Sequence, residues 1–123
     1  MTNHDNRAAL LTVYNHETGE VEGRGLTVAQ AAAIILAYDG GTYSIERGDT
    51  GHDIGEEAQW ELHSKSLNGR WTRTRSVKPI YAISAEAAWP LIAREVLRAC
   101  GAWRLPLSVV ADADYDAMIA EAE

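Results

Sequence analysis

Residues 27–47 of this 123-residue chain read TVAQAAAIILAYDGGTYSIER, and this stretch decides the class of fold. Thr27 and Gln30 make a capping-box pattern, because the Thr27 hydroxyl can accept from the Gln30 backbone amide while the Gln30 side chain reaches back. The alanine-rich run that follows predicts a helix over residues 28–38, which Gly40 ends in the left-handed conformation. The helix is expected to bury one apolar stripe, formed by Ala31, Ile34, Ile35 and Tyr38.

Patterns on both sides of this stretch predict the other elements. Apolar or alternating runs predict strands over residues 10–14, 20–26, 42–47, 59–66 and 71–83. Helical spacing predicts a helix over 85–100, capped by Ser84, with a kink near residues 87–89 caused by Pro90. It also predicts a last helix that begins at Asp112 or Asp114 and has Tyr115, Met118 and Ile119 as its apolar face. The order ββ-α-βββ-α-α predicts an α+β fold, in which an antiparallel sheet carries helices packed on one face.

The length predicts one domain with one core. Residues 1–9 are polar and are expected to form a flexible arm, and residues 10–123 the single α+β domain. Residues 103–110 are expected to be an apolar connector. The segment 103–123 could pack on the sheet or project as a binding arm, and its apolar residues between 103 and 110 suit either docking or a dimer contact.

Composition excludes several classes of protein. Apolar residues make up 46% of the chain and charged residues 24%, which is typical of a globular domain. The longest uncharged apolar run, residues 28–38, is about half of the roughly 20 residues that cross a bilayer, so no membrane association is expected. The single cysteine, Cys100, excludes an intramolecular disulfide and a multi-cysteine zinc site, and it favours the reducing cytoplasm.

The net charge of −7 is divided unevenly along the chain. Residues 1–59 hold three basic and ten acidic residues, and residues 81–123 hold three basic and seven acidic residues. Residues 60–80 instead hold five basic residues and one acidic residue, a net charge of +4. The chain is therefore acidic toward both ends and basic across one predicted hairpin.

The register of that hairpin decides whether its basic residues form a patch. A two-residue turn would place Trp60 and Leu62 on one face with Arg73 and Arg75, which makes a poor core. A three-residue loop closed by Gly69 reverses the parity and groups Trp60 and Leu62 with Thr72, Thr74 and Ile80. Burial favours this second register, with a bulge at Lys78 and Pro79. The opposite face then carries Glu61 and, with the turn, the predicted basic binding residues His63, Lys65, Arg70, Trp71, Arg73 and Arg75.

Such a face has three interpretations. Its cations and aromatic ring could hold phosphates and stack a base or sugar. It could meet an acidic protein surface, or it could be an ordinary solvated sheet face. Residues 42–100, three strands and then a helix that opens Ile83-Ser84-Ala85-Glu86, resemble the three-stranded DNA readers of the AP2 and integrase-arm kind. This resemblance implies a sheet that enters the major groove.

Catalytic motifs are weak. Asp49-Thr50-Gly51 matches the tripeptide of aspartic proteases, but Glu46-Arg47-Gly48 before it is not an apolar strand that could bury a carboxylate pair. His52-Asp53 with the glutamates that follow has no metal-ligand spacing. No phosphate loop or nucleophile elbow occurs. We therefore expect no enzyme, cofactor or metal, and keep as an alternative a small enzyme or metal-binding protein that uses the loop 49–57.

A second resemblance concerns general properties of the chain and not a motif. In its small size, acidity and lack of catalytic motifs, the chain resembles accessory proteins of phages and mobile elements, of the anti-CRISPR kind. That resemblance implies an inhibitor that occupies the surface of a protein or nucleoprotein complex, with acidic side chains in place of phosphates. The acidic segments 17–22, 46–57 and 112–123 would offer this surface. The candidate residues of the central loop are Glu46, Asp49, Asp53, Glu56 and Glu57.

Overall fold

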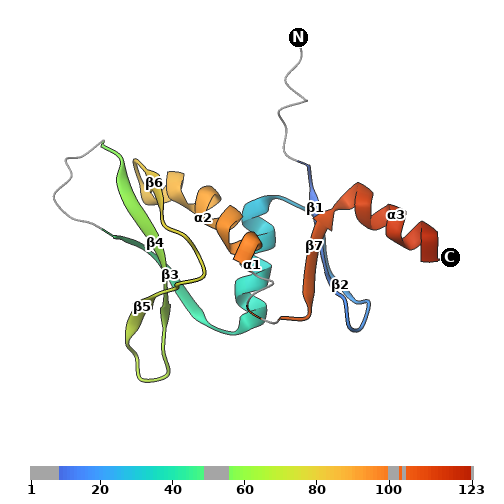
Figure 1. Ribbon diagram of the computed structural model, residues 1–123, viewed down its shortest axis with the longest axis horizontal. Helices are drawn as coiled ribbons and strands as arrows, with labels where there is room; N and C mark the ends of the chain where they lie inside the picture. Colours follow the sequence, from blue (N-terminus) through green and yellow to red (C-terminus); the bar gives the residue numbers. More distant parts are fainter. Residues whose placement is uncertain (1–8, 49–55, 100–102, 104, 123) are drawn as a thin grey trace, which may run out of the picture.

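The computed structural model of the protein describes residues 9–48, 56–99, 103 and 105–122. It is an α+β fold built from two antiparallel sheets and three helices (Figure 1). The elements in chain order are β1 Leu11–Asn15, β2 Val21–Leu26, α1 Val28–Asp39, β3 Thr42–Arg47, β4 Ala58–Lys65, β5 Trp71–Arg73, β6 Ile80–Ala82, α2 Ala85–Ala99, β7 Leu107–Ala111 and α3 Asp112–Ala122.

Helix α1 begins and ends as predicted. The Thr27 hydroxyl accepts from the Gln30 amide, the Gln30 side chain accepts from the Thr27 amide, and Gly40 ends the helix at φ 80°. The buried stripe is different from the prediction, because it consists of Ala31, Ala32, Ile35 and Leu36. Tyr38 is 43% exposed. The helix sequence is apolar nearly all round, so its periodicity could not identify which face is buried.

The prediction of a single sheet is wrong, because the strands form two sheets. A three-stranded sheet has the order β2-β1-β7, and a four-stranded sheet has the order β3-β4-β5 with β6 also paired to β4. The difference arises because β1 and β2 pair with each other and not with β3 to β6. Residues 107–111 add a third strand, β7, to their sheet and are not part of a connector. This strand runs antiparallel to β1, with Val13 opposite Val109.

Helices α1 and α2 lie between the two sheets (Figure 1). Helix α1 packs on β1 and β2, helix α2 packs on β3, β4 and β6, and the two helices pack on each other. One cluster of buried side chains joins all of these layers, from Val13 on β1 through Ile35 and Ile92 to Leu62 on β4. The helices therefore hold both sheets to a common core.

The predicted three-residue loop of the central hairpin is confirmed. The Ser66 amide donates to the Arg70 carbonyl at 2.8 Å, and Gly69 adopts the left-handed conformation at φ 83°. Lys65 is paired with Trp71, and His63 with Arg73. The register that buries Leu62 and places the charged side chains on the opposite side of the sheet is therefore the one that forms.

The predicted strand over residues 71–83 is interrupted. Its two ends form β5 and β6, and between them the chain leaves the sheet in a turn, where the Val77 amide donates to the Thr74 carbonyl at 3.1 Å. Val77 is fully buried in the core. A bulge was expected near Pro79, and the observed interruption is longer because Val77 folds inward.

Helix α2 is confirmed, with the Ser84 hydroxyl accepting from the Ala87 amide at 3.1 Å. Pro90 lies inside this helix, which continues on both sides of it. Cys100 lies outside the described residues.

Candidate binding surfaces

The outer face of the four-stranded sheet turns away from the helices. On β4 the inward side chains are Ala58, Trp60 and Leu62, so the alternate positions point outward. The pairing of the strands then fixes their neighbours. We call this set the outer face: Thr42, Ser44 and Glu46 on β3, Gln59, Glu61, His63 and Lys65 on β4, Trp71 and Arg73 on β5, and Tyr81 on β6.

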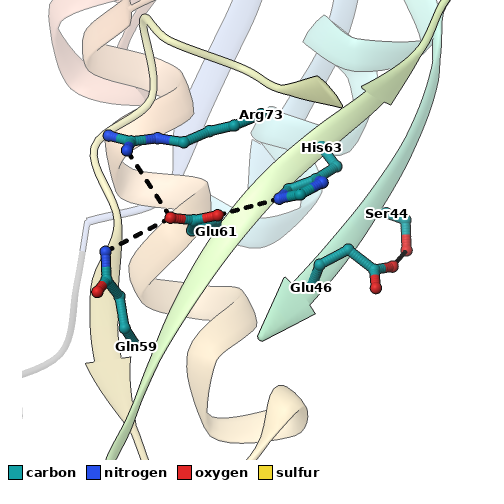
Figure 2. A network of polar contacts seen from close by, with 6 residues as sticks. All are labelled: Ser44, Glu46, Gln59, Glu61, His63 and Arg73. Carbon is teal, nitrogen blue, oxygen red and sulfur yellow. Dashed lines mark hydrogen bonds and ion pairs between the residues drawn. The ribbon is translucent and has the colours of Figure 1, made fainter. Parts of the chain in front are cut away.

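Glu61 is the centre of a polar network on this face (Figure 2). One carboxylate oxygen lies 3.0 Å from His63 Nε2, and the other lies 3.5 Å from Gln59 Nε2 and 3.8 Å from Arg73 Nη1. The Glu61 side chain is only 13% exposed, although it points away from the core. The backbone of Gly48 packs against it, because a Cβ atom at Gly48 would lie 2.7 Å from the Glu61 carboxyl carbon.

A second acidic side chain also lies on this face. Glu46 is paired with Glu61 across β3 and β4, and its carboxylate accepts from the Ser44 hydroxyl at 2.5 Å (Figure 2). The sequence analysis put Glu46 at the end of the predicted strand 42–47 but grouped it with the acidic loop that follows. The structure confirms the strand and places Glu46 beside the basic residues. The outer face is therefore mixed in charge at its centre.

The predicted basic residues are only partly brought together. His63, Lys65, Trp71 and Arg73 lie on the outer face, and Arg70 follows Gly69 in the exposed hairpin loop. The Lys65 ammonium lies 6.0 Å from the centre of the Trp71 ring. The predicted position of Arg75 is wrong, because this residue lies in the turn that carries Val77 inward and not on the strand with Arg73.

The predicted acidic loop is described only at its ends. Asp49 and Asp53 lie outside the described residues, whereas Glu56 and Glu57 are exposed where the chain approaches β4.

A different surface forms where helix α3 folds over the three-stranded sheet. The Thr12 hydroxyl, which is fully buried, donates to the Asp112 carboxylate at 2.6 Å where β7 passes into α3. The rings of Tyr14 and Tyr115 lie 5.3 Å apart. Arg24 lies 5.4 Å from the Tyr115 ring centre and pairs with Asp116 at 2.9 Å. These contacts fix the first turns of α3 on β1 and β2.

The Tyr14 hydroxyl also lies 3.9 Å from the Met118 sulfur, yet none of the residues of α3 is buried. Tyr115, Met118 and Ile119 were predicted as its apolar face, and Met118 and Ile119 are 40% and 44% exposed. Val21 on β2 is exposed as well, and it is paired with Tyr14. We call these five residues, Tyr14, Val21, Tyr115, Met118 and Ile119, the α3 patch.

Sequence reasoning missed several surface residues. Tyr81 alternates with the inward residues Ile80 and Ala82, so its outward position could have been inferred from the strand pattern. Tyr14 could not be linked to α3, and neither could its strand partner Val21, because the contact of Tyr14 with α3 depends on β7 pairing with β1.

Among the residues that the structure describes, no three His, Cys, Asp or Glu side chains form a group that could hold a metal ion. Nor is any helix in this part of the chain both long and apolar enough to cross a membrane.

Comparisons with known proteins provide no relative: no family model matches the chain, and searches of curated proteins and solved structures found no match. The resemblances to sheet-based DNA readers and to anti-CRISPR proteins therefore stay predictions from the sequence.

Proposed function

We propose that the protein binds a basic surface of a partner protein through the α3 patch and carries out no chemistry of its own. By occupying that surface it would exclude the partner's own ligand, which is an inhibitor's mode of action and requires no catalytic residue.

The observation that carries the proposal is the exposed apolar face of α3. Tyr115, Met118, Ile119 and Ala122 follow the spacing i, i+3, i+4, i+7, which is the pattern of a helix that docks its apolar face. Within the chain, Tyr14 contacts this face at Tyr115 and Met118, and Met118 and Ile119 stay 40% and 44% exposed. Exposed large apolar side chains that lie together and are surrounded by polar ones are typical of protein interaction sites.

Charge indicates which partner fits this patch. Helix α3 carries Asp112, Asp114, Asp116 and Glu121 and has no basic residue. The neighbouring hairpin of β1 and β2 adds exposed Glu17, Glu20 and Glu22. A basic partner would be steered toward this surface at long range, and high salt would weaken the attraction.

The outer face supports chemistry less well. His63 and Glu61 are in contact, but they lie on an open sheet face, and the Ser44 hydroxyl bonds to Glu46 rather than to His63. A nucleophile needs a base within hydrogen-bond reach.

A capture experiment tests the proposal. The immobilised protein is exposed to lysate of the organism that encodes it, next to variants Met118→Asp and Ile119→Asp. We expect the wild type to retain a basic protein that is released at high salt. With that partner purified, each variant should weaken binding by about tenfold or more, as expected for a buried anchor residue.

The matched control is Leu67→Asp, because Leu67 is fully exposed in the hairpin loop between β4 and β5. This variant introduces the same charge and is expected to bind as the wild type does. Equal binding by the α3 variants, or a partner that only Leu67→Asp releases, contradicts the proposal.

A further inference from the structure

We propose that the outer face binds a short single strand of nucleic acid, with Trp71 and Tyr81 as stacking platforms and Lys65, Arg70 and Arg73 as phosphate ligands. This proposal is independent of the α3 patch, which lies beyond the other sheet, on the far side of helices α1 and α2 (Figure 1).

The first observation is the exposure of two aromatic rings on one sheet face. Trp71 is 42% exposed and Tyr81 is 60% exposed. Trp71 is paired with Lys65 and Tyr81 with Gln59, so both rings point to the same side of β4. Their partners are six positions apart on β4, which corresponds to about 20 Å. A short extended strand of nucleotides could cross between them.

The second observation is the position of the cations. Lys65 is the direct neighbour of Trp71, with its ammonium 6.0 Å from the ring centre. Arg70 precedes Trp71 in the chain, and Arg73 lies two positions further along the same strand, on the same face. A base stacked on Trp71 would have its flanking phosphates within reach of these side chains. This combination of aromatic ring and cations is typical of surfaces that bind single strands.

The third observation concerns the carboxylate in the middle of the face. Glu61 would repel a phosphate if it were free, but His63, Gln59 and Arg73 surround it and its side chain is 13% exposed (Figure 2). Glu46 is the exposed acid, and it opposes the binding of phosphate. We therefore expect moderate affinity that increases when Glu46 is neutralised.

The exposed rings favour a single strand over a duplex. Bases in a duplex have their faces covered by neighbouring base pairs, so they cannot stack on Trp71 or Tyr81. Unpaired bases offer that face to an aromatic side chain. A duplex lying in the same place would use the cations alone.

The test is fluorescence anisotropy of a labelled thymine oligonucleotide of about 12 nucleotides, a length within the usual site size of single-strand binders. We expect binding at low salt. If three phosphates are contacted, log K falls with log salt at a slope of about −2, so a tenfold rise in salt weakens binding about 100-fold. Trp71→Ala should weaken binding about tenfold, and Glu46→Gln should strengthen it.

Two control variants keep the result specific. Tyr38→Ala removes an exposed aromatic ring from α1, and Arg98→Gln removes an exposed cation from α2. Both are expected to bind as the wild type does, whereas Arg73→Gln should reduce the salt slope by about 0.7. No binding at low salt, tighter binding of a duplex of equal length, or equal losses in Trp71→Ala and Tyr38→Ala would overturn the proposal. Loss of protein binding by the α3 variants would not affect it.

Discussion

Val77 is the residue that breaks the predicted strand after β5. It is fully buried, although it lies in a turn and its neighbours Ser76 and Lys78 are exposed. The chain leaves the sheet after Thr74 and returns at Ile80, and this excursion carries the Val77 side chain into the core. One inward side chain thereby moves Arg75 off the face on which strand alternation would place it.

Val77→Ala tests this account of the turn. The variant removes two buried methyl groups, so we expect the free energy of unfolding to fall by about 2 kcal/mol, from lost burial and a small cavity. Urea denaturation measures it. Val21→Ala removes the same atoms from an exposed position and should change stability by less than about 0.5 kcal/mol. Equal effects of the two changes would show that Val77 is not a core residue.

Tyr43 carries a second prediction at the scale of one residue. It is partly buried on β3, stacks on Trp103 with ring centres 6.3 Å apart, and donates to the Asp39 carboxylate. Burial, and then the hydrogen bond and the charge of Asp39, raise the pKa of the Tyr43 hydroxyl well above its usual range. The unfolded chain therefore loses this proton at lower pH than the folded protein does.

This order of proton loss determines whether the stability of the folded protein rises or falls with pH. The contribution of Tyr43 to stability is fully present below the unfolded pKa of about 10 and is lost as the pH rises above it. Tyr43→Phe should thus lose stability less steeply than the wild type in alkaline solution, measured by urea denaturation at several pH values. Tyr38→Phe, an exposed tyrosine on α1, should keep the wild-type slope. Identical slopes for all three proteins would exclude the proposed raised pKa.

Among the elements, those with local signals could be predicted from the sequence, and β7 could not. The capping box of α1, the Ser84 cap of α2 and Gly69 in the hairpin each act within a few residues, so the sequence pattern is sufficient. Strand β7 pairs with β1, which is roughly a hundred residues away in the chain, and no local pattern specifies that partner. Without this pairing, residues 107–111 have only the pattern of an apolar connector.

The same limit applies to the candidate surfaces. The parity of the hairpin placed His63, Lys65, Trp71 and Arg73 on one face correctly. The position of Glu46 beside Glu61 depends on the register between β3 and β4, and it was missed. The apolar side chains of α3 were predicted, but their exposure depends on how little of the three-stranded sheet the helix covers.

Helix α3 is anchored through Asp112, and this contact gives a prediction for the element. Thr12 is fully buried and donates to Asp112, so Asp112→Ala leaves a buried hydroxyl without its acceptor, at a cost of about 1–3 kcal/mol. Thr12→Val removes that hydroxyl. In a double-mutant cycle, we expect Asp112→Ala to cost clearly less in the Thr12→Val background. Additive losses would mean that the hydrogen bond does not hold α3.

For the whole molecule, the shared core predicts that both sheets unfold together. None of the four tryptophans lies on β1, β2 or β7, so tryptophan fluorescence reports on the other half of the molecule, whereas far-UV circular dichroism reports on both halves. Because Val13 on β1 belongs to the same buried cluster as Leu62 on β4, the two signals should share one urea midpoint.

The variant Val13→Ala tests directly whether the two sheets unfold together. Val13 is fully buried in the three-stranded sheet, and its truncation should lower the midpoint of both signals by the same amount. A midpoint that moves in circular dichroism but stays constant in fluorescence would show two units that fold independently.

The whole molecule has an acidic, partly apolar surface at α3 and a mixed sheet face on the other side of the helices. If both proposals hold, the partner would be a nucleoprotein that occupies the two surfaces together. The net charge of −7 makes the acidic surface the one that acts at long range.

Site-specific photo-crosslinking in cells of the organism that encodes the protein tests the central claim most directly. The photoreactive residue p-benzoylphenylalanine replaces Ile119 on α3 in one variant and Leu67 in the hairpin loop in another, both at exposed positions. We predict that the substitution at Ile119 yields a crosslink to a basic protein and that the substitution at Leu67 does not. Crosslinking to a protein at Leu67 alone, or none at Ile119, would contradict the claim that α3 is the binding surface.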